Sequence, residues 1–238
     1  MSGYTRRQLK EDKFAETAQG AAHWATGHRL VLAWAIGLAV VVVLATAGIV
    51  AWRGRQSEQA NLELSAAMRT FNAQLRAPGT PAGENGPSFT SMAERGTAAA
   101  KEFQAIADKY SSVKPGKIAG YMQGVALIQT GDNAAAERQL KAAADSGDKD
   151  VAALAKMALA SIYRASNRVS DAAAIYNDLK QHPTSSVSKA QALLELAEMY
   201  EKTDPQQAAS IYQQLQKENP QSAAAQVASQ KLAKSRQN

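Results

Sequence analysis

Hydrophobic and polar residues follow two different patterns along this chain. Residues 30–52 (LVLAWAIGLAVVVVLATAGIVAW) form one apolar run without a charge or a proline, whereas most of the remaining sequence mixes apolar and polar residues at helical spacing. A helix of that length measures about 34 Å, enough to cross the roughly 30 Å hydrocarbon core of a bilayer. The run therefore predicts a transmembrane helix.

Two other interpretations compete with a permanent anchor. Ala45-Thr46-Ala47 has the small-x-small form of a signal-peptidase site. The run continues to Trp52, however, beyond the roughly 7 to 15 residues of a signal-peptide core, and Trp52 lies where an interfacial ring is expected. A buried helix of a soluble protein would be shorter and would carry a polar stripe. The pattern favours a retained anchor.

Basic residues flank the run unequally. The positive-inside rule weighs Lys and Arg close to the ends of a span, and more of them precede this one than follow it. We therefore expect residues 1–29 to form a cytoplasmic juxtamembrane tail, helical over 5–28, and residues 53–238 to lie on the other side. The basic residues before the run are Arg6, Arg7, Lys10, Lys13 and Arg29, and those directly after it are Arg53 and Arg55.

The segment after the span is predicted to continue as a helix over residues 53–76. Its apolar positions recur at helical spacing, which predicts one buried stripe. Residues 77–90 follow; their 77–88 part (APGTPAGENGPS) is rich in Pro and Gly, which predicts a flexible loop. The predicted stripe consists of Leu64, Met68, Phe71 and Leu75.

A repeat with a period of about 36 residues occupies the region from 91 to 238. A small residue recurs at this spacing and larger residues follow it at +4 and +7, so these positions share one helical face. Another helix precedes this one in each unit, and it also carries a small residue followed by a larger one at +3. Such units are helical hairpins that bury their apolar faces only by stacking, which predicts an all-α solenoid. The recurring small residues are Ala100, Ala136, Ala172 and Ala208, and the residues at +4 are Gln104, Leu140, Tyr176 and Tyr212; in the other helix the pairs are Gly124 and Leu127, Ala160 and Tyr163, and Ala197 and Tyr200.

Residues typical of turns occur where this repeat predicts breaks between helices. Gly131-Asp132 and Asp204-Pro205 are typical of a break followed by an N-cap, so each separates the two helices of a unit. His182-Pro183 and Asn219-Pro220 are predicted to end units.

The repeats resemble the tetratricopeptide repeat. The resemblance rests on Leu159-Ala160, Tyr163, Ala172, Tyr176 and Pro183 in one unit, with matching positions in the units before and after it. It implies an array whose last helix, residues 221–236, is a capping helix. In such arrays the first helix of each unit lines a concave protein-binding groove. The positions carried over are Tyr121, Val125 and Ile128; Met157, Ser161 and Arg164; and Leu194, Glu198 and Glu201. The alternative for Val125, Ile128 and Leu194 is packing between helices.

The whole layout also resembles a narrower family, the bacterial ancillary subunit of the SecYEG translocon. The residues that carry this resemblance are the Leu9-Lys10-x-Asp12-Lys13-Phe14 run and Ala51-Trp52-Arg53 at the end of the span. It implies an inner-membrane protein with a periplasmic repeat domain, chaperone-like behaviour, and translocon components and exported or non-native chains as partners. The alternatives are a structural scaffold of an envelope assembly complex and a cytoplasm-facing repeat adaptor.

Composition and charge give no sign of a catalytic, metal or nucleic-acid site, and so leave protein binding as the predicted function. The net charge of +6 is spread among interleaved acidic and basic residues, which argues against a nucleic-acid partner. The sequence has no Cys and three His, and His182 precedes a proline without a nucleophile beside it in a catalytic arrangement. Asp145, Asp148 and Asp150 form an acidic turn that lacks the spacing of a calcium loop. We therefore expect a protein without enzymatic activity, cofactor or metal, whose function is binding.

Overall fold

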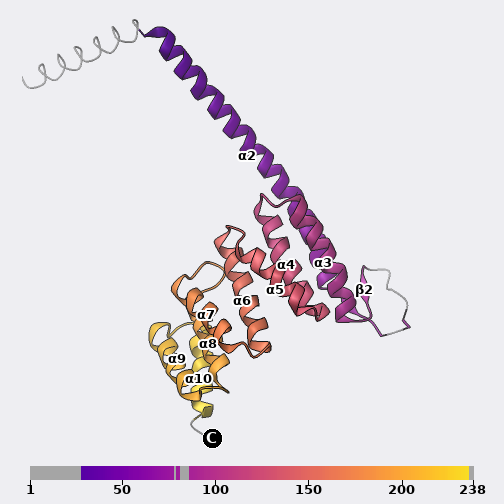
Figure 1. The fold of residues 1–238 in the computed structure, drawn as a ribbon, viewed down its shortest axis with the longest axis vertical. Coiled ribbons are helices and arrows are strands. Elements are labelled where there is room, and N and C mark those ends of the chain that lie inside the picture. Colours follow the sequence, from indigo (N-terminus) through magenta and orange to yellow (C-terminus); the bar gives the residue numbers. More distant parts are fainter. Residues whose placement is uncertain (1–27, 78, 81–85, 236–238) are drawn as a thin grey trace, which may run out of the picture. The chain divides into compact units, whose positions relative to one another are not determined.

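The computed structural model describes residues 28–77, 79–80 and 86–235, and it is all-α, as predicted. Helices follow one another along the chain with short connections (Figure 1). The chain divides into two compact units between Arg55 and Gln56, within helix α2. The helices are α2 (Arg29–Phe71), α3 (Met92–Lys109), α4 (Lys114–Thr130), α5 (Asn133–Ala144), α6 (Lys149–Ala165), α7 (Val169–Gln181), α8 (Lys189–Tyr200), α9 (Pro205–Glu218) and α10 (Ala223–Ser235).

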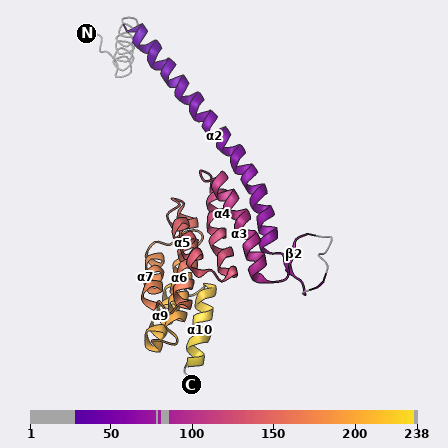
Figure 2. The same cartoon turned by 45° about the vertical axis from the view of Figure 1, so that its right-hand side comes forward.

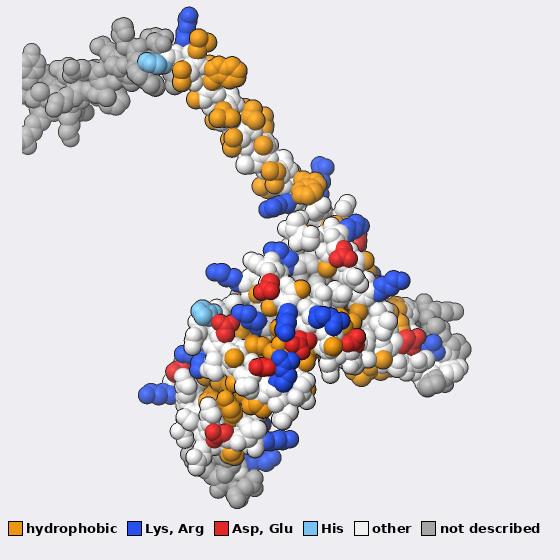
Figure 3. All heavy atoms as spheres, viewed as in Figure 1, with side chains coloured by type: hydrophobic (Ala, Val, Ile, Leu, Met, Phe, Trp, Pro, Cys, Tyr) orange, Lys and Arg blue, Asp and Glu red, His pale blue; other side chains and the backbone are white. Residues whose placement is uncertain are grey.

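The N-terminal unit contains the apolar run. Within the described residues, α2 holds the segment that is long and apolar enough to cross a membrane, with a mean hydropathy of 2.7 over its best window. Its large side chains are exposed; Trp34, for example, is 81% exposed. Figure 3 shows apolar side chains along this part of the helix, with basic side chains at both of its ends. The helix predicted for residues 5–28 lies almost entirely outside the described residues.

The part of α2 after Gln56 belongs to the repeat unit and packs against α3. Ala60 and Ala67 are buried in the same cluster as Phe103 of α3, and the rings of Phe71 and Phe103 are 6.1 Å apart. The predicted stripe is correct for Leu64, Met68 and Phe71, which pack against this cluster. It is wrong for Leu75, because α2 ends at Phe71 and Leu75 is 47% exposed.

A short parallel strand pair closes the loop that follows α2. Strand β1 (Gln74–Leu75) pairs with β2 (Ser88–Phe89), and the backbone N–H of Arg76 donates to the Phe89 carbonyl at 2.8 Å. The sequence did not predict these strands. Residues 78 and 81–85 of the loop lie outside the described residues.

The remaining helices pack as successive antiparallel neighbours, α4 with α5, α6 with α7 and α8 with α9 (Figures 1 and 2). The small residues of the repeat are the points of close approach. A Cβ atom at Gly124 of α4 would lie 2.6 Å from Cγ of Leu140 on α5. One cluster of buried residues runs from Ala136 to Leu232, with Leu140, Tyr176, Leu193 and Leu215 fully buried. This cluster crosses successive hairpins, as the repeat predicts.

The predicted caps are confirmed. Asp132 accepts a hydrogen bond from the N–H of Ala135, and Asp204 accepts one from the N–H of Gln207, with Pro205 as the first residue of α9. His182 ends α7, and Asn219 ends α9. The final helix α10 buries Ala225, Ala228 and Leu232 on one face and leaves its other described positions half-buried or exposed, which is the pattern of a capping helix.

Candidate protein-binding surface

The nine residues predicted to line the groove lie on the first helices of successive hairpins. Tyr121, Val125 and Ile128 are on α4, Met157, Ser161 and Arg164 are on α6, and Leu194 and Glu198 are on α8, which Glu201 follows as its C-cap residue. Ser161 and Arg164 are exposed, and the other seven are half-buried.

Most of the apolar members of this set pack partly against the core. Tyr121, Ile128, Met157 and Leu194 are half-buried side chains in contact with the main cluster. Burial raises the pKa of the Tyr121 hydroxyl. Packing between helices therefore accounts for part of the surface of Ile128 and Leu194. The surface they leave exposed offers apolar contact.

Two ion pairs join neighbouring repeats across this surface. Arg164 Nη1 of α6 lies 3.3 Å from Glu195 Oε2 of α8, and Lys231 Nζ of α10 lies 3.0 Å from Glu201 Oε1 at the end of α8. Arg164 and Glu201 are 37 residues apart and carry opposite charges. Both are among the predicted groove residues, but each also connects two repeats.

A buried tyrosine lies near each of these pairs. The Tyr212 hydroxyl of α9 donates to Glu201 Oε1 at 2.8 Å. Tyr176 occupies the equivalent position on α7; it is fully buried, and its hydroxyl has no hydrogen-bond partner among the described residues. Burial, reinforced by the nearby Glu195 carboxylate, raises the pKa of Tyr176.

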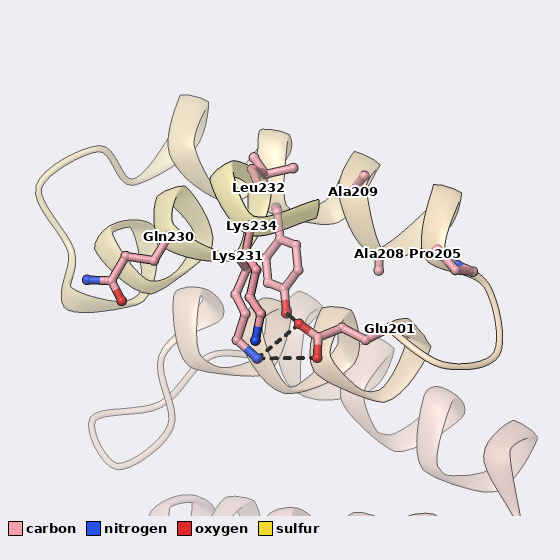
Figure 4. A pocket seen from close by; sticks show the side chains of 9 residues that line it. Glu201, Pro205, Ala208, Ala209, Gln230, Lys231, Leu232 and Lys234 are labelled. Atoms are coloured by element: carbon pink, nitrogen blue, oxygen red, sulfur yellow. Dashed lines mark hydrogen bonds and ion pairs between the residues drawn. The ribbon is translucent and has the colours of Figure 1, made fainter. Parts of the chain in front are cut away.

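Two pockets lie at junctions between repeats. The α6–α8 pocket has a volume of about 400 Å³ and brings together three of the predicted residues, Arg164, Glu198 and Glu201. Its other lining residues are Asn167, Val169, Met199, Lys202 and Thr203. The α9–α10 pocket, shown in Figure 4, has a volume of about 430 Å³. It is lined by Glu201, Pro205, Ala208, Ala209, Tyr212, Gln230, Lys231, Leu232 and Lys234.

A charged network fixes the turn between α6 and α7, beside the first of these pockets. Glu137 of α5 accepts hydrogen bonds from Lys141 at 2.7 Å, Arg168 at 3.0 Å and the Tyr163 hydroxyl at 3.1 Å. The guanidinium of Arg168 stacks on the Tyr163 ring at 3.9 Å. Bonds from Lys141 first, and then from Arg168 and Tyr163, lower the pKa of Glu137 to about 2.

This network predicts a pH-dependent contribution to stability. Because the pKa of Glu137 is lower in the folded chain than the ordinary 4.5, its contribution is present above pH 4.5 and is lost as the pH falls toward 2. We expect Glu137→Gln to lower the free energy of unfolding by about 1 kcal/mol at pH 6, the Coulombic part being reduced by solvent screening. The difference from the unmodified chain should shrink steadily below pH 4.5 and be small at pH 2.

Urea titrations followed by circular dichroism between pH 2 and pH 6 would measure this difference. Glu58→Gln is the matched control, since Glu58 is exposed and its replacement removes the same charge from another surface position. A difference between Glu137→Gln and the unmodified chain that stays constant with pH would contradict the network.

The acidic and His side chains of the turns have structural partners in the described residues. Among the described residues, no group of three or more His, Cys, Asp or Glu side chains is placed to hold a metal ion. Asp148 is the N-cap of α6, and Asp150 accepts a hydrogen bond from the Ser185 hydroxyl at 2.7 Å. His182 lies at the end of α7 with Nδ1 3.0 Å from Asp178 Oδ1. These groups act in capping and in linking loops.

Comparison with known proteins gives two matches to protein families. A family described as tetratricopeptide repeat-like domain matches residues 31–182, and one described as tetratricopeptide repeat matches residues 191–222. The first match covers more than half of the chain and includes the apolar segment of α2. Repeats of these families are typically non-catalytic modules for protein–protein interaction. No curated protein and no solved structure matches the chain.

Proposed function

Since the chain belongs to the tetratricopeptide repeat-like domain family, we propose that it is a membrane-anchored protein of the bacterial envelope that binds exported or non-native polypeptides near the Sec translocon. The observation that carries the proposal is the family match over residues 31–182. This single match includes both a helix long and apolar enough to cross a membrane and repeats of a protein-binding family. The resemblance to the ancillary translocon subunit supports the choice of partner.

The proposed topology is a single pass through the bacterial inner membrane. Residues 30–52 contact lipid, the N-terminus is cytoplasmic and the repeat domain is periplasmic. The excess of Lys and Arg before the span supports this orientation. A chain without Cys is compatible with an oxidising compartment.

Binding on the proposed surface is weak and tolerant of sequence. Half-buried Tyr121, Met157 and Leu194 offer shallow apolar contact, and Ser161 and Arg164 offer polar contacts beside it. Such a surface suits unfolded segments of many sequences, as a chaperone-like factor requires. The anchor compensates for low affinity because it raises the effective concentration of the repeats at the membrane.

Two measurements on cells that express the full chain test this proposal. The first is protease digestion of intact spheroplasts. Cleavage within residues 56–235 from outside is expected, and protection until the membrane is opened would support the cytoplasm-facing adaptor instead.

The second measurement is photocrosslinking from a benzoylphenylalanine placed at Ser161 of α6 during protein export. We expect translocon components and many exported chains as products. The matched control is Ala174, an exposed position on α7, the second helix of the same hairpin. Equal products from both positions would overturn the proposed surface. One stoichiometric product from Ser161 would indicate a structural scaffold.

A further inference from the structure

The two pockets occupy equivalent places in successive repeats but differ in charge. Val169 and Pro205 are 36 residues apart, and each lies at the start of a second helix and lines its own pocket. The α6–α8 pocket carries two basic and two acidic side chains. The α9–α10 pocket carries Glu201 with Lys231 and Lys234, a net charge of +1. Of the two, the α9–α10 pocket therefore favours an anion.

The carboxylate already present in the α9–α10 pocket is fully engaged. Lys231 Nζ lies 3.0 Å from Glu201 Oε1 and 3.2 Å from Oε2, and the Tyr212 hydroxyl donates to Oε1. Burial alone would raise the pKa of Glu201, but the bonds from Lys231 and Tyr212, together with the charges of Lys231 and Lys234, outweigh it and lower the pKa. Lys234 runs beside Lys231 toward this group in Figure 4. No carboxylate of the described residues forms an ion pair with Lys234.

Apart from Gln230 and the Tyr212 hydroxyl, the rest of the pocket lining is apolar. Pro205, Ala208 and Ala209 of α9 form one wall, and Leu232 contributes from α10. A volume of about 430 Å³ is enough for a few side chains of a polypeptide. The pocket thus presents the Lys234 ammonium, which is in no ion pair with a carboxylate of the described residues, next to an aliphatic wall. This arrangement is complementary to a carboxylate side chain beside an aliphatic residue.

We propose that the α9–α10 pocket binds an acidic residue of a partner polypeptide through Lys234, with a neighbouring aliphatic side chain against Pro205 and Ala209. This deepens the proposed function and rests on it, since it names the chemistry of one part of a bound client. A phosphate group fits less well. The pocket has no Arg, and the Asp204 carboxylate accepts from the Gln207 N–H at the N-terminus of α9, where phosphates otherwise bind.

Fluorescence anisotropy on the full chain in detergent micelles tests the proposal. The probe is the fluorescein-labelled peptide GSGSALEALE with an amidated C-terminus, and the comparison peptides replace both Glu residues by Gln or by Lys. The Glu peptide should bind about tenfold more tightly than the Gln peptide. Lys234→Glu should remove this preference and favour the Lys peptide.

Lys217→Glu is the matched control. Lys217 is exposed on α9 and lies outside the pocket, so the variant changes the net charge equally without changing the lining. If Lys217→Glu changes the peptide affinities as much as Lys234→Glu does, the preference for the Glu peptide is general electrostatic attraction and the proposed binding in the pocket is wrong. Unchanged Glu-peptide binding by Lys234→Glu would overturn it as well.

Two further results would contradict the peptide proposal and can be told apart. In one the pocket binds lipid, and in the other the pocket binds no client although the proposed surface does. If Lys234→Glu reduces binding to phosphatidylglycerol vesicles and leaves peptide binding unchanged, the pocket serves lipid and the peptide proposal is wrong. If crosslinking from Ser161 succeeds while Lys234→Glu has no effect on the peptides, the pocket fails but the proposed function stands.

Discussion

Replacing Gly116 with alanine is expected to lower the free energy of unfolding by about 3 kcal/mol, at the upper end for overpacking in a buried site. Gly116 lies in the first turn of α4 and is buried. A Cβ atom there would lie 2.0 Å from the carbonyl oxygen and 2.5 Å from the carbonyl carbon of Tyr110. Both contacts are with backbone, so no side-chain rotation relieves them.

The backbone around this contact has little freedom to move. The Gly116 N–H donates to the Val113 carbonyl at 3.1 Å, and the Val113 N–H donates to the Tyr110 carbonyl at 3.1 Å. Tyr110 is itself buried, and its hydroxyl donates to Glu63 of α2 at 2.8 Å. Relief of the clash therefore disturbs the packing of α2, α3 and α4 together.

Gly120→Ala is the matched control, because it makes the same change one helical turn further along α4. A Cβ atom at Gly120 would lie 3.5 Å from Gln139 Nε2, which is ordinary contact. Alanine is a better helix former than glycine, so the control should be neutral or stabilising by up to about 1 kcal/mol. Urea unfolding of the full chain in detergent, followed by circular dichroism, measures both variants. Similar stability of the two would contradict the tight turn at Tyr110.

The repeats could be predicted from sequence because their signal is periodic. Small residues such as Gly124 and Ala160 recur at fixed spacing, and caps such as Asp132 mark the turns. The end of α2 has no such signal. The apolar spacing continues to Leu75, but the helix ends at Phe71. The side chain of the next residue, Asn72, donates to the Met68 carbonyl at 2.9 Å, a local bond that competes with further helix. Strands of two residues are too short to show an alternating pattern.

The contacts of the predicted groove residues could not be derived from the sequence. The family pattern predicts which residues of each first helix face the groove, and Arg164 and Glu201 are among the predicted residues. Their partners Glu195 and Lys231 lie 31 and 30 residues further along the chain. Whether such a pair forms depends on the side-chain geometry between repeats, which spacing alone does not fix. The two pockets depend on the same geometry, so the sequence did not reveal them.

Two neighbouring leucines on α8 give the second large prediction. Replacing each in turn distinguishes a core residue from a residue of the predicted groove. Leu193 is 0% exposed in the main cluster, whereas Leu194 is half-buried and belongs to the predicted groove. Consecutive helical residues point about 100° apart, so each side chain has its own surroundings. We expect Leu193→Ala to lower the free energy of unfolding by about 3 kcal/mol through the lost contact and the cavity that remains.

Leu194→Ala should cost only about 1 kcal/mol, since less of its side chain is removed from water, but it should reduce crosslinking of exported chains from Ser161. Leu193→Ala should leave that crosslinking unchanged at temperatures where the variant is folded. Unfolding in urea and crosslink yield, measured on the same preparations, distinguish the two effects. If Leu194→Ala is as destabilising as Leu193→Ala, Leu194 is a core residue and the apolar part of the proposed surface is limited to α4 and α6.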